Sequence, residues 1–191
     1  MVLILPPIER TWADSKAFIV RMEWSQIQST VRGATADDCA VVFPDRLVHI
    51  ERRNQQLPSV QASLQVYEFT LTEDQIASLR NILGDPALAG LPSFAPFGLP
   101  GSVIVREALF VDVPQDDAVR RFGYEEWQAA SPPDAEDSKR QALQNKQSIA
   151  KTALQPLLHW FSILVSQPNV SARPAEPNFC STPSHADGES Q

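Results

Sequence analysis

The chain has 191 residues, and its 23 acidic and 16 basic side chains give it a net charge of −7. Hydrophobic residues make up 43% and charged residues 20% of the sequence, which is typical of a globular protein and excludes a disordered or fibrous chain. An acidic chain with scattered lysines and arginines binds nucleic acids and anionic membranes poorly, and no apolar run reaches the ~20 residues of a membrane span. We therefore expect neither a nucleic-acid partner nor a membrane span.

Composition divides the chain into three segments. Residues 1–16 show little periodicity and are expected to form a lead-in segment. Residues 17–167 carry the periodic patterns of a single domain. Residues 168–191 hold four prolines and many small polar side chains, which predicts a disordered polar tail.

A period of two predicts six strands, because successive side chains of a strand point to opposite faces. The clearest case is the alternation of Phe18, Val20, Met22 and Trp24 with the residues between them. The expected strands cover residues 18–24, 39–43, 47–53, 64–71, 102–113 and 119–124. Short links between the first four indicate an antiparallel meander.

The segment around 73–83 carries both the start and the stop signals of a helix. Thr72 and Gln75 form a capping box, in which each side chain bonds to the backbone N–H of the other residue. Gly84 is expected to end the helix in the left-handed conformation, and Pro86 prevents its continuation. The apolar stripe of this helix consists of Ile76, Leu79, Ile82 and Leu83.

A second helical region begins after Ser131, is polar to about residue 148, and then carries a core-facing stripe. The stripe consists of Ala150, Ala153, Leu154, Leu157, Leu158, Phe161, Leu164 and Val165. Pro156 lies inside this pattern and removes a backbone hydrogen bond, so we expect a kink or a break there. The order of elements predicts an α+β fold, an antiparallel sheet of about six strands packed on two helices.

Motifs of catalysis and of cofactor binding are missing from the sequence. There is no phosphate-binding loop, dinucleotide fingerprint, nucleophile elbow or zinc motif, and seven glycines among 191 residues are too few for glycine-rich loops. The three histidines lie far apart in the sequence, and His49 is expected on a polar strand face with Glu51 and Arg53. We expect no catalytic residue, no metal ligand and no cofactor.

The cysteines Cys39 and Cys180 are 141 positions apart, which is neither a metal-ligand nor a redox-pair spacing. They are either two unrelated thiols or a disulfide that holds the tail, and a disulfide requires an oxidising compartment. The first residues, Met1 to Pro7, lack the basic region and the long apolar stretch of a secretory signal. Cytoplasmic localisation is therefore expected, although a secreted protein without its leader would have the same sequence.

The loop 91–101 is the clearest candidate for a binding surface. Its prolines restrict the backbone, and rigid aromatic loops lose little entropy on binding. In one interpretation its side chains contact another protein together with an aromatic cluster at 122–127, and in the other Phe94 and Phe97 fold back over the sheet. The candidate partner-binding residues are Phe94, Phe97, Leu99, Tyr124 and Trp127.

Three stretches of sequence resemble a known family. The run from Phe69 to Arg80, the run from Pro86 to Ser93, and the helical stretch from Ala153 to Trp160 resemble emfourin-like proteins. These are small bacterial inhibitors of thermolysin-type metallopeptidases, and the similarity spans roughly residues 64–165. The chain departs from the family by extra strands at its start, an insertion around 114–148 and a tail, and no inhibitory residue matches. The resemblance implies a bacterial protein that binds another protein.

Three functions remain open from the sequence. The preferred prediction is a non-enzymatic protein-interaction module that acts as a peptidase inhibitor. The first alternative is a carrier of small apolar ligands with a pocket between the sheet and the last helix. The second is a carboxylate-based hydrolase whose site combines acidic side chains with His49 across the sheet.

Overall fold

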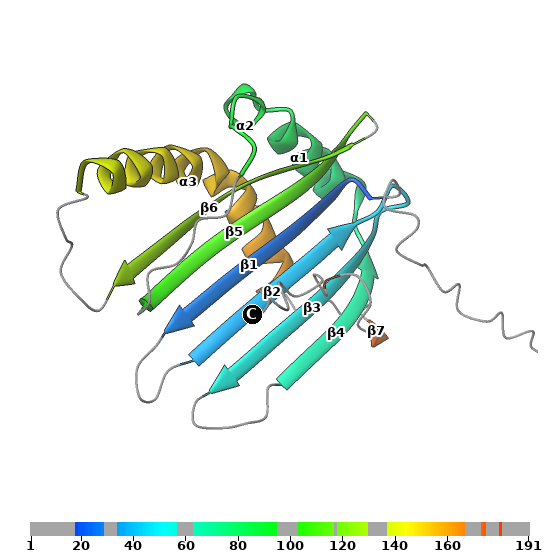
Figure 1. The fold of residues 1–191 in the computed structure, drawn as a ribbon. Helices are drawn as coiled ribbons and strands as arrows, with labels where there is room; N and C mark the ends of the chain where they lie inside the picture. Colours follow the sequence, from blue (N-terminus) through cyan, green and yellow to red (C-terminus); the bar gives the residue numbers. More distant parts are fainter. Residues whose placement is uncertain are drawn as a thin grey trace, which may run out of the picture.

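A computed structural model describes residues 18–28, 34–56, 63–94, 103–116, 118–129, 137–166, 173–174 and 180. The strands form one antiparallel sheet in the order β6-β5-β1-β2-β3-β4-β7, with helices on one side (Figure 1). The strands are β1 Val20–Gln28, β2 Ala34–Val42, β3 Leu47–Gln56, β4 Ser63–Thr70, β5 Val103–Gln115, β6 Ala118–Ala129 and β7 Arg173–Pro174. The α+β arrangement predicted from the sequence is confirmed, with the two-residue β7 added at one edge.

The helix α1 spans Glu73–Leu83 and begins as predicted. The Thr72 hydroxyl accepts from the Gln75 N–H at 3.2 Å, and the Gln75 side chain accepts from the Thr72 N–H at 2.9 Å. Gly84 ends the helix in a right-handed conformation with φ −80°, so the expected left-handed residue was wrong. A short helix α2, Pro86–Ala89, follows, and the Asp85 side chain caps it by accepting from the Ala87 N–H at 2.8 Å.

The helix α3 spans Asp137–Ser166 and continues through Pro156 without a break. Figure 1 shows that α3 changes direction along its length, as expected for a helix with an internal proline. Two side chains of the sheet bind the C-terminal end of α3: Arg52 and Tyr67 both donate to the Val165 carbonyl, at 3.0 and 3.2 Å. The Arg52 guanidinium thereby places a cation at the negative end of the helix dipole.

The hydrophobic core lies between the sheet and the helices. Every second residue of the central strands faces it, and the buried stripe of α3 packs against them, as its three-and-four spacing predicted. Fully buried members from the sheet and from the helices are Val20, Met22, Ile50, Leu109, Tyr124, Leu79, Leu154 and Leu157. The other side of the sheet, which we call the open face, carries no helix of the described residues (Figure 1).

Candidate functional site

The open face of the sheet carries a set of charged side chains that are largely buried. Arg21 and Arg121 flank Asp112, with nitrogen-to-oxygen distances of 2.8 and 2.7 Å, and Glu23 lies beside both arginines. Burial raises the pKa of the Glu23 carboxyl, and the two arginines partly oppose this rise. A period of two predicts that these side chains share a face, but it does not predict their burial.

His49 of β3 also lies on the open face, where it is completely buried between two carboxylates. Its Nε2 lies 3.0 Å from the Glu51 Oε1 and its Nδ1 lies 3.1 Å from the Glu68 Oε1. A neutral imidazole has a single N–H, so it cannot donate to both carboxylates at once. The pair of contacts therefore requires an additional proton, or another cation on one side of the ring.

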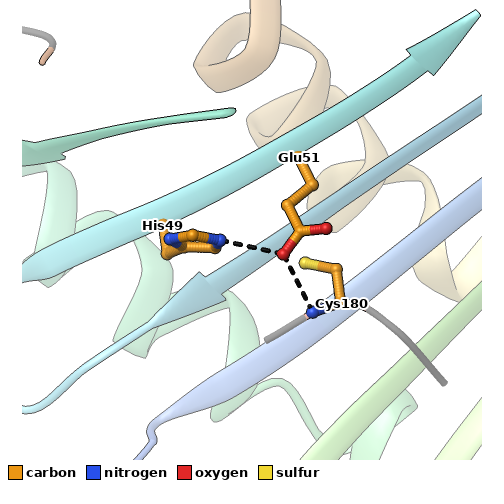
Figure 2. A group of neighbouring side chains, drawn as sticks. All are labelled: His49, Glu51 and Cys180. Atoms are coloured by element: carbon orange, nitrogen blue, oxygen red, sulfur yellow. Dashed lines mark hydrogen bonds and ion pairs between the residues drawn. The ribbon is translucent and has the colours of Figure 1, made fainter. Parts of the chain in front are cut away.

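Cys180 reaches this cluster from the far end of the chain. It forms a disulfide with Cys39, which lies directly opposite Glu51 in the pairing of β2 and β3. Its backbone N–H also donates to the Glu51 Oε1 at 3.2 Å, and Figure 2 shows the three residues around that oxygen. Cys180 is thus fixed to the centre of the sheet.

Of the predicted disordered tail, residues 168–191, the structure describes Arg173, Pro174 and Cys180. Arg173–Pro174 forms β7 and pairs with Tyr67 and Glu68 of β4. Cys180 is held by its disulfide and by its hydrogen bond to Glu51. The remaining residues of 168–191, and the lead-in segment 1–16, lie outside the described residues.

A hollow of about 420 Å³ opens next to the disulfide. Its described lining combines carboxylates and guanidinium groups with apolar side chains, so it is neither a purely charged nor a purely apolar recess. The lining residues are Glu23, Trp24, Ser25, Asp37, Asp38, Cys39, Glu51, Arg53, Leu64, Arg106, Phe110 and Cys180.

Only part of the sequence-predicted interaction surface falls on described side chains. Phe94 folds back over the sheet, with its ring 4.8 Å from that of Phe110 and its N–H donating to the Arg121 carbonyl at 2.9 Å. Tyr124 is completely buried in the core, and its hydroxyl donates to the Glu107 Oε1 at 2.6 Å. Tyr124 was therefore wrongly assigned to a partner surface, because its strand position faces the helices. Phe97 and Leu99, and the side chain of Trp127, lie outside the described residues.

The His49 cluster contains side chains that are suited to hold a metal ion. A ring nitrogen of His49, a carboxylate oxygen of Glu51 and the Cys180 Sγ all lie within 4.8 Å of one another. Strand alternation places His49 beside Glu51, and the Cys39–Cys180 disulfide is one of the two interpretations left open by the sequence. The position of Cys180 next to His49 and Glu51 was not predicted, because contacts over such a separation leave no local signal. Matching β2 to β3 in register would have added Cys39, which faces Glu51.

Comparison with known proteins adds no assignment. No family model, no curated protein and no solved structure matches the chain. Among the described residues, no helix has both the length and the apolar character needed to cross a membrane. Fold and site define an α+β protein whose sheet has one helix-covered face and one open, charged face with a hollow.

Proposed function

We propose that this protein is a non-enzymatic protein-interaction module that binds its partner at the hollow of the open face. The observation that carries this proposal is the hollow itself, about 420 Å³ with a lining of mixed polarity. Charged groups held beside apolar side chains allow a site to recognise a partner by charge complementarity as well as by shape. Leu64, Asp37 and Arg53 are exposed at this site and provide contacts for a partner.

The state of His49 supports a binding role over the hydrolase alternative. A general base must reach the reacting group of its substrate with a free ring nitrogen. Both ring nitrogens of His49 face carboxylates inside the protein, and none of its surface is exposed. In this conformation the imidazole has no contact with a substrate in the hollow.

The position of the hollow supports a binding role over the carrier alternative. A carrier of apolar ligands was expected to hold them between the sheet and the last helix. That space is filled by Leu154, Leu157 and Phe161 of α3, each at most 2% exposed. The hollow is instead lined largely from the open face, where carboxylates and guanidinium groups would be desolvated by an apolar ligand.

As the class of partner we propose thermolysin-type metallopeptidases, on the basis of the resemblance to emfourin-like inhibitors. The test measures hydrolysis of a peptide substrate by thermolysin and by related peptidases at increasing concentrations of this protein. We expect saturable inhibition that leaves the protein uncleaved. Absence of inhibition and of binding across the panel would contradict the inhibitor assignment.

A matched pair of variants tests whether the hollow is the contact surface. The triple variant Leu64→Ser, Asp37→Asn and Arg53→Gln changes exposed side chains of the hollow. The control Val119→Ser, Asp74→Asn and Arg80→Gln makes the same chemical changes at exposed positions that do not line the hollow. We expect inhibition to weaken roughly 10-fold or more in the first variant only, the effect of losing interface contacts worth about 1.4 kcal/mol. Equal loss in both variants would place the contact elsewhere.

A further inference from the structure

We propose that reduction of the Cys39–Cys180 disulfide converts the His49 cluster into a zinc site with Cys39, Cys180, His49 and Glu51 as ligands. The four residues supply two thiolates, one imidazole and one carboxylate. Thiolate, imidazole and carboxylate groups are each zinc ligands, and four protein ligands suit the tetrahedral geometry of a closed zinc site. The inference does not depend on the proposed peptidase partner, because metal binding is measured without one.

The positions of the donor atoms carry the inference. Atoms of His49, Glu51 and Cys180 lie within 4.8 Å of one another, and the Cys39 Sγ is bonded to that of Cys180. A tetrahedral zinc ion with bonds of about 2.0–2.3 Å separates its ligand atoms by about 3.3–3.8 Å. The atoms of His49, Glu51 and Cys180 therefore need to approach one another by at most roughly 1.0–1.5 Å around the ion. The Cys39 Sγ lies outside this 4.8 Å group, so it must separate from the Cys180 Sγ and turn toward the ion.

The contacts of His49 provide a second, independent observation. Its Nδ1 lies 3.1 Å from the Glu68 Oε1, and its Nε2 faces Glu51. If Nδ1–H donates to Glu68, Nε2 carries its lone pair on the side of Glu51, where it is oriented to bind a metal ion. This carboxylate–histidine pair is the arrangement that orients metal-binding histidines in zinc sites.

The hollow provides a path for the ion. Cys39, Glu51 and Cys180 all line it, so the donor atoms border a recess of about 420 Å³. His49 lies behind them and is completely buried. The metal would thus bind at the wall of the hollow, with His49 as its innermost ligand.

The chemical steps balance with a dithiol or a phosphine as the reductant. The reductant supplies two electrons, the S–S bond breaks, and two protons convert the sulfur atoms of Cys39 and Cys180 into thiols. A dithiol becomes a disulfide, and a phosphine becomes its oxide with an oxygen atom from water. Zinc then displaces both thiol protons and forms two Zn–S bonds. Either the disulfide or the metal holds Cys180 on the sheet.

The experiment uses the full chain and Co²⁺ as a spectroscopic probe for zinc. The protein is reduced with a phosphine under argon, the phosphine is removed, and Co²⁺ is titrated. We expect one Co²⁺ per chain, with the visible bands of tetrahedral cobalt and a near-ultraviolet thiolate-to-cobalt band, both of which disappear when Zn²⁺ is added. The oxidised chain is expected to show neither band.

Variants separate the ligands from their surroundings, and circular dichroism of each variant checks its fold. Cys180→Ser should reduce the thiolate band to roughly half, because one of two sulfur ligands is lost. Glu68→Gln should weaken Co²⁺ binding roughly 10–100-fold while keeping the thiolate band, because Glu68 orients His49 without touching the ion. Asp37 lines the same hollow but is not a proposed ligand, so Asp37→Asn should leave the affinity for Co²⁺ unchanged.

Four results would overturn the inference. The first is a reduced chain that binds Co²⁺ only in six-coordinate form or not at all. The second is a thiolate band that persists at full intensity in Cys180→Ser. The third is an oxidised chain that binds Co²⁺ as tightly as the reduced chain. The fourth is a chain that unfolds on reduction and does not refold when Co²⁺ is added.

Discussion

The two faces of the sheet are stabilised by different physical interactions. The helix-covered face buries aliphatic and aromatic side chains from six strands and from three helices, α1, α2 and α3. The open face buries ion pairs, a histidine between two carboxylates, and a disulfide with a small apolar cluster that includes Val41 and Phe43. Apolar burial scarcely depends on pH or redox conditions, whereas charged groups respond to pH and disulfides respond to redox conditions. The helix-covered face therefore holds the fold, and the open face is where solution conditions can alter the protein.

The largest effect is expected on the helix-covered face. Leu154 is completely buried in α3, so Leu154→Ala should lower the free energy of unfolding by about 2–5 kcal/mol through lost transfer energy and a cavity. Ile149 lies on the same helix and is 67% exposed, so Ile149→Ala should change the free energy of unfolding by about 0.5 kcal/mol or less. Denaturant unfolding of both variants measures the difference. Equal effects would show that α3 does not pack on the sheet through this stripe.

The two faces of the sheet also differ in how much of each could be predicted from the sequence. Apolar periodicity placed Leu154 and Leu157 in the core, and the capping box of Thr72 and Gln75 fixed the start of α1, because both signals are local. α2 was missed, since its four residues are too few to show a period. On the open face, the same alternation predicted that His49 and Glu51 are neighbours. It did not predict their burial or the arrival of Cys180, which depend on contacts between distant parts of the chain.

An intermediate effect is expected for the ion pairs of the open face. Asp112 is buried between Arg21 and Arg121, so Asp112→Asn leaves two guanidinium groups with one acidic neighbour fewer. Removing one partner of a fully buried pair costs roughly 3–5 kcal/mol. Because Arg121 is about one-third exposed, we expect a loss of about 2–3 kcal/mol, measured by denaturant unfolding.

Asp37→Asn is the matched control, because it removes a carboxylate from the same face at an exposed position. It should change stability by about 0.5 kcal/mol or less. Added salt should reduce the difference in unfolding free energy between Asp112→Asn and Asp37→Asn only slightly, because buried ion pairs are weakly screened. A neutral effect of Asp112→Asn would mean that the open face contributes little to folding, and the contrast between the faces would then be one of composition only.

The smallest effect is expected for Glu23, and it appears in the dependence of stability on pH. Burial raises the pKa of the Glu23 carboxyl above its ordinary value of 4.5, so the folded protein holds this proton more tightly than the unfolded chain. The stabilisation from protonated Glu23 is complete below the ordinary pKa and is lost as the pH rises through the raised pKa of the folded state. Glu23→Gln has no proton to lose, so this loss of stability is absent from the variant.

The relevant quantity is the stability of Glu23→Gln minus that of the parent protein, measured by denaturant unfolding at several pH values. This difference should increase as the pH rises from below 4.5 and level off above the raised pKa, with a change of about 1 kcal/mol or less. Glu23→Gln also loses the contacts with Arg21 and Arg121. This loss shifts the plot of the stability difference against pH as a whole, but it does not change the slope of the plot at higher pH. The raised pKa of Asp38 acts in both proteins and cancels. A difference that stays flat or falls with pH would show that Glu23 is hydrated in solution and that the open face is less buried there than the structure places it.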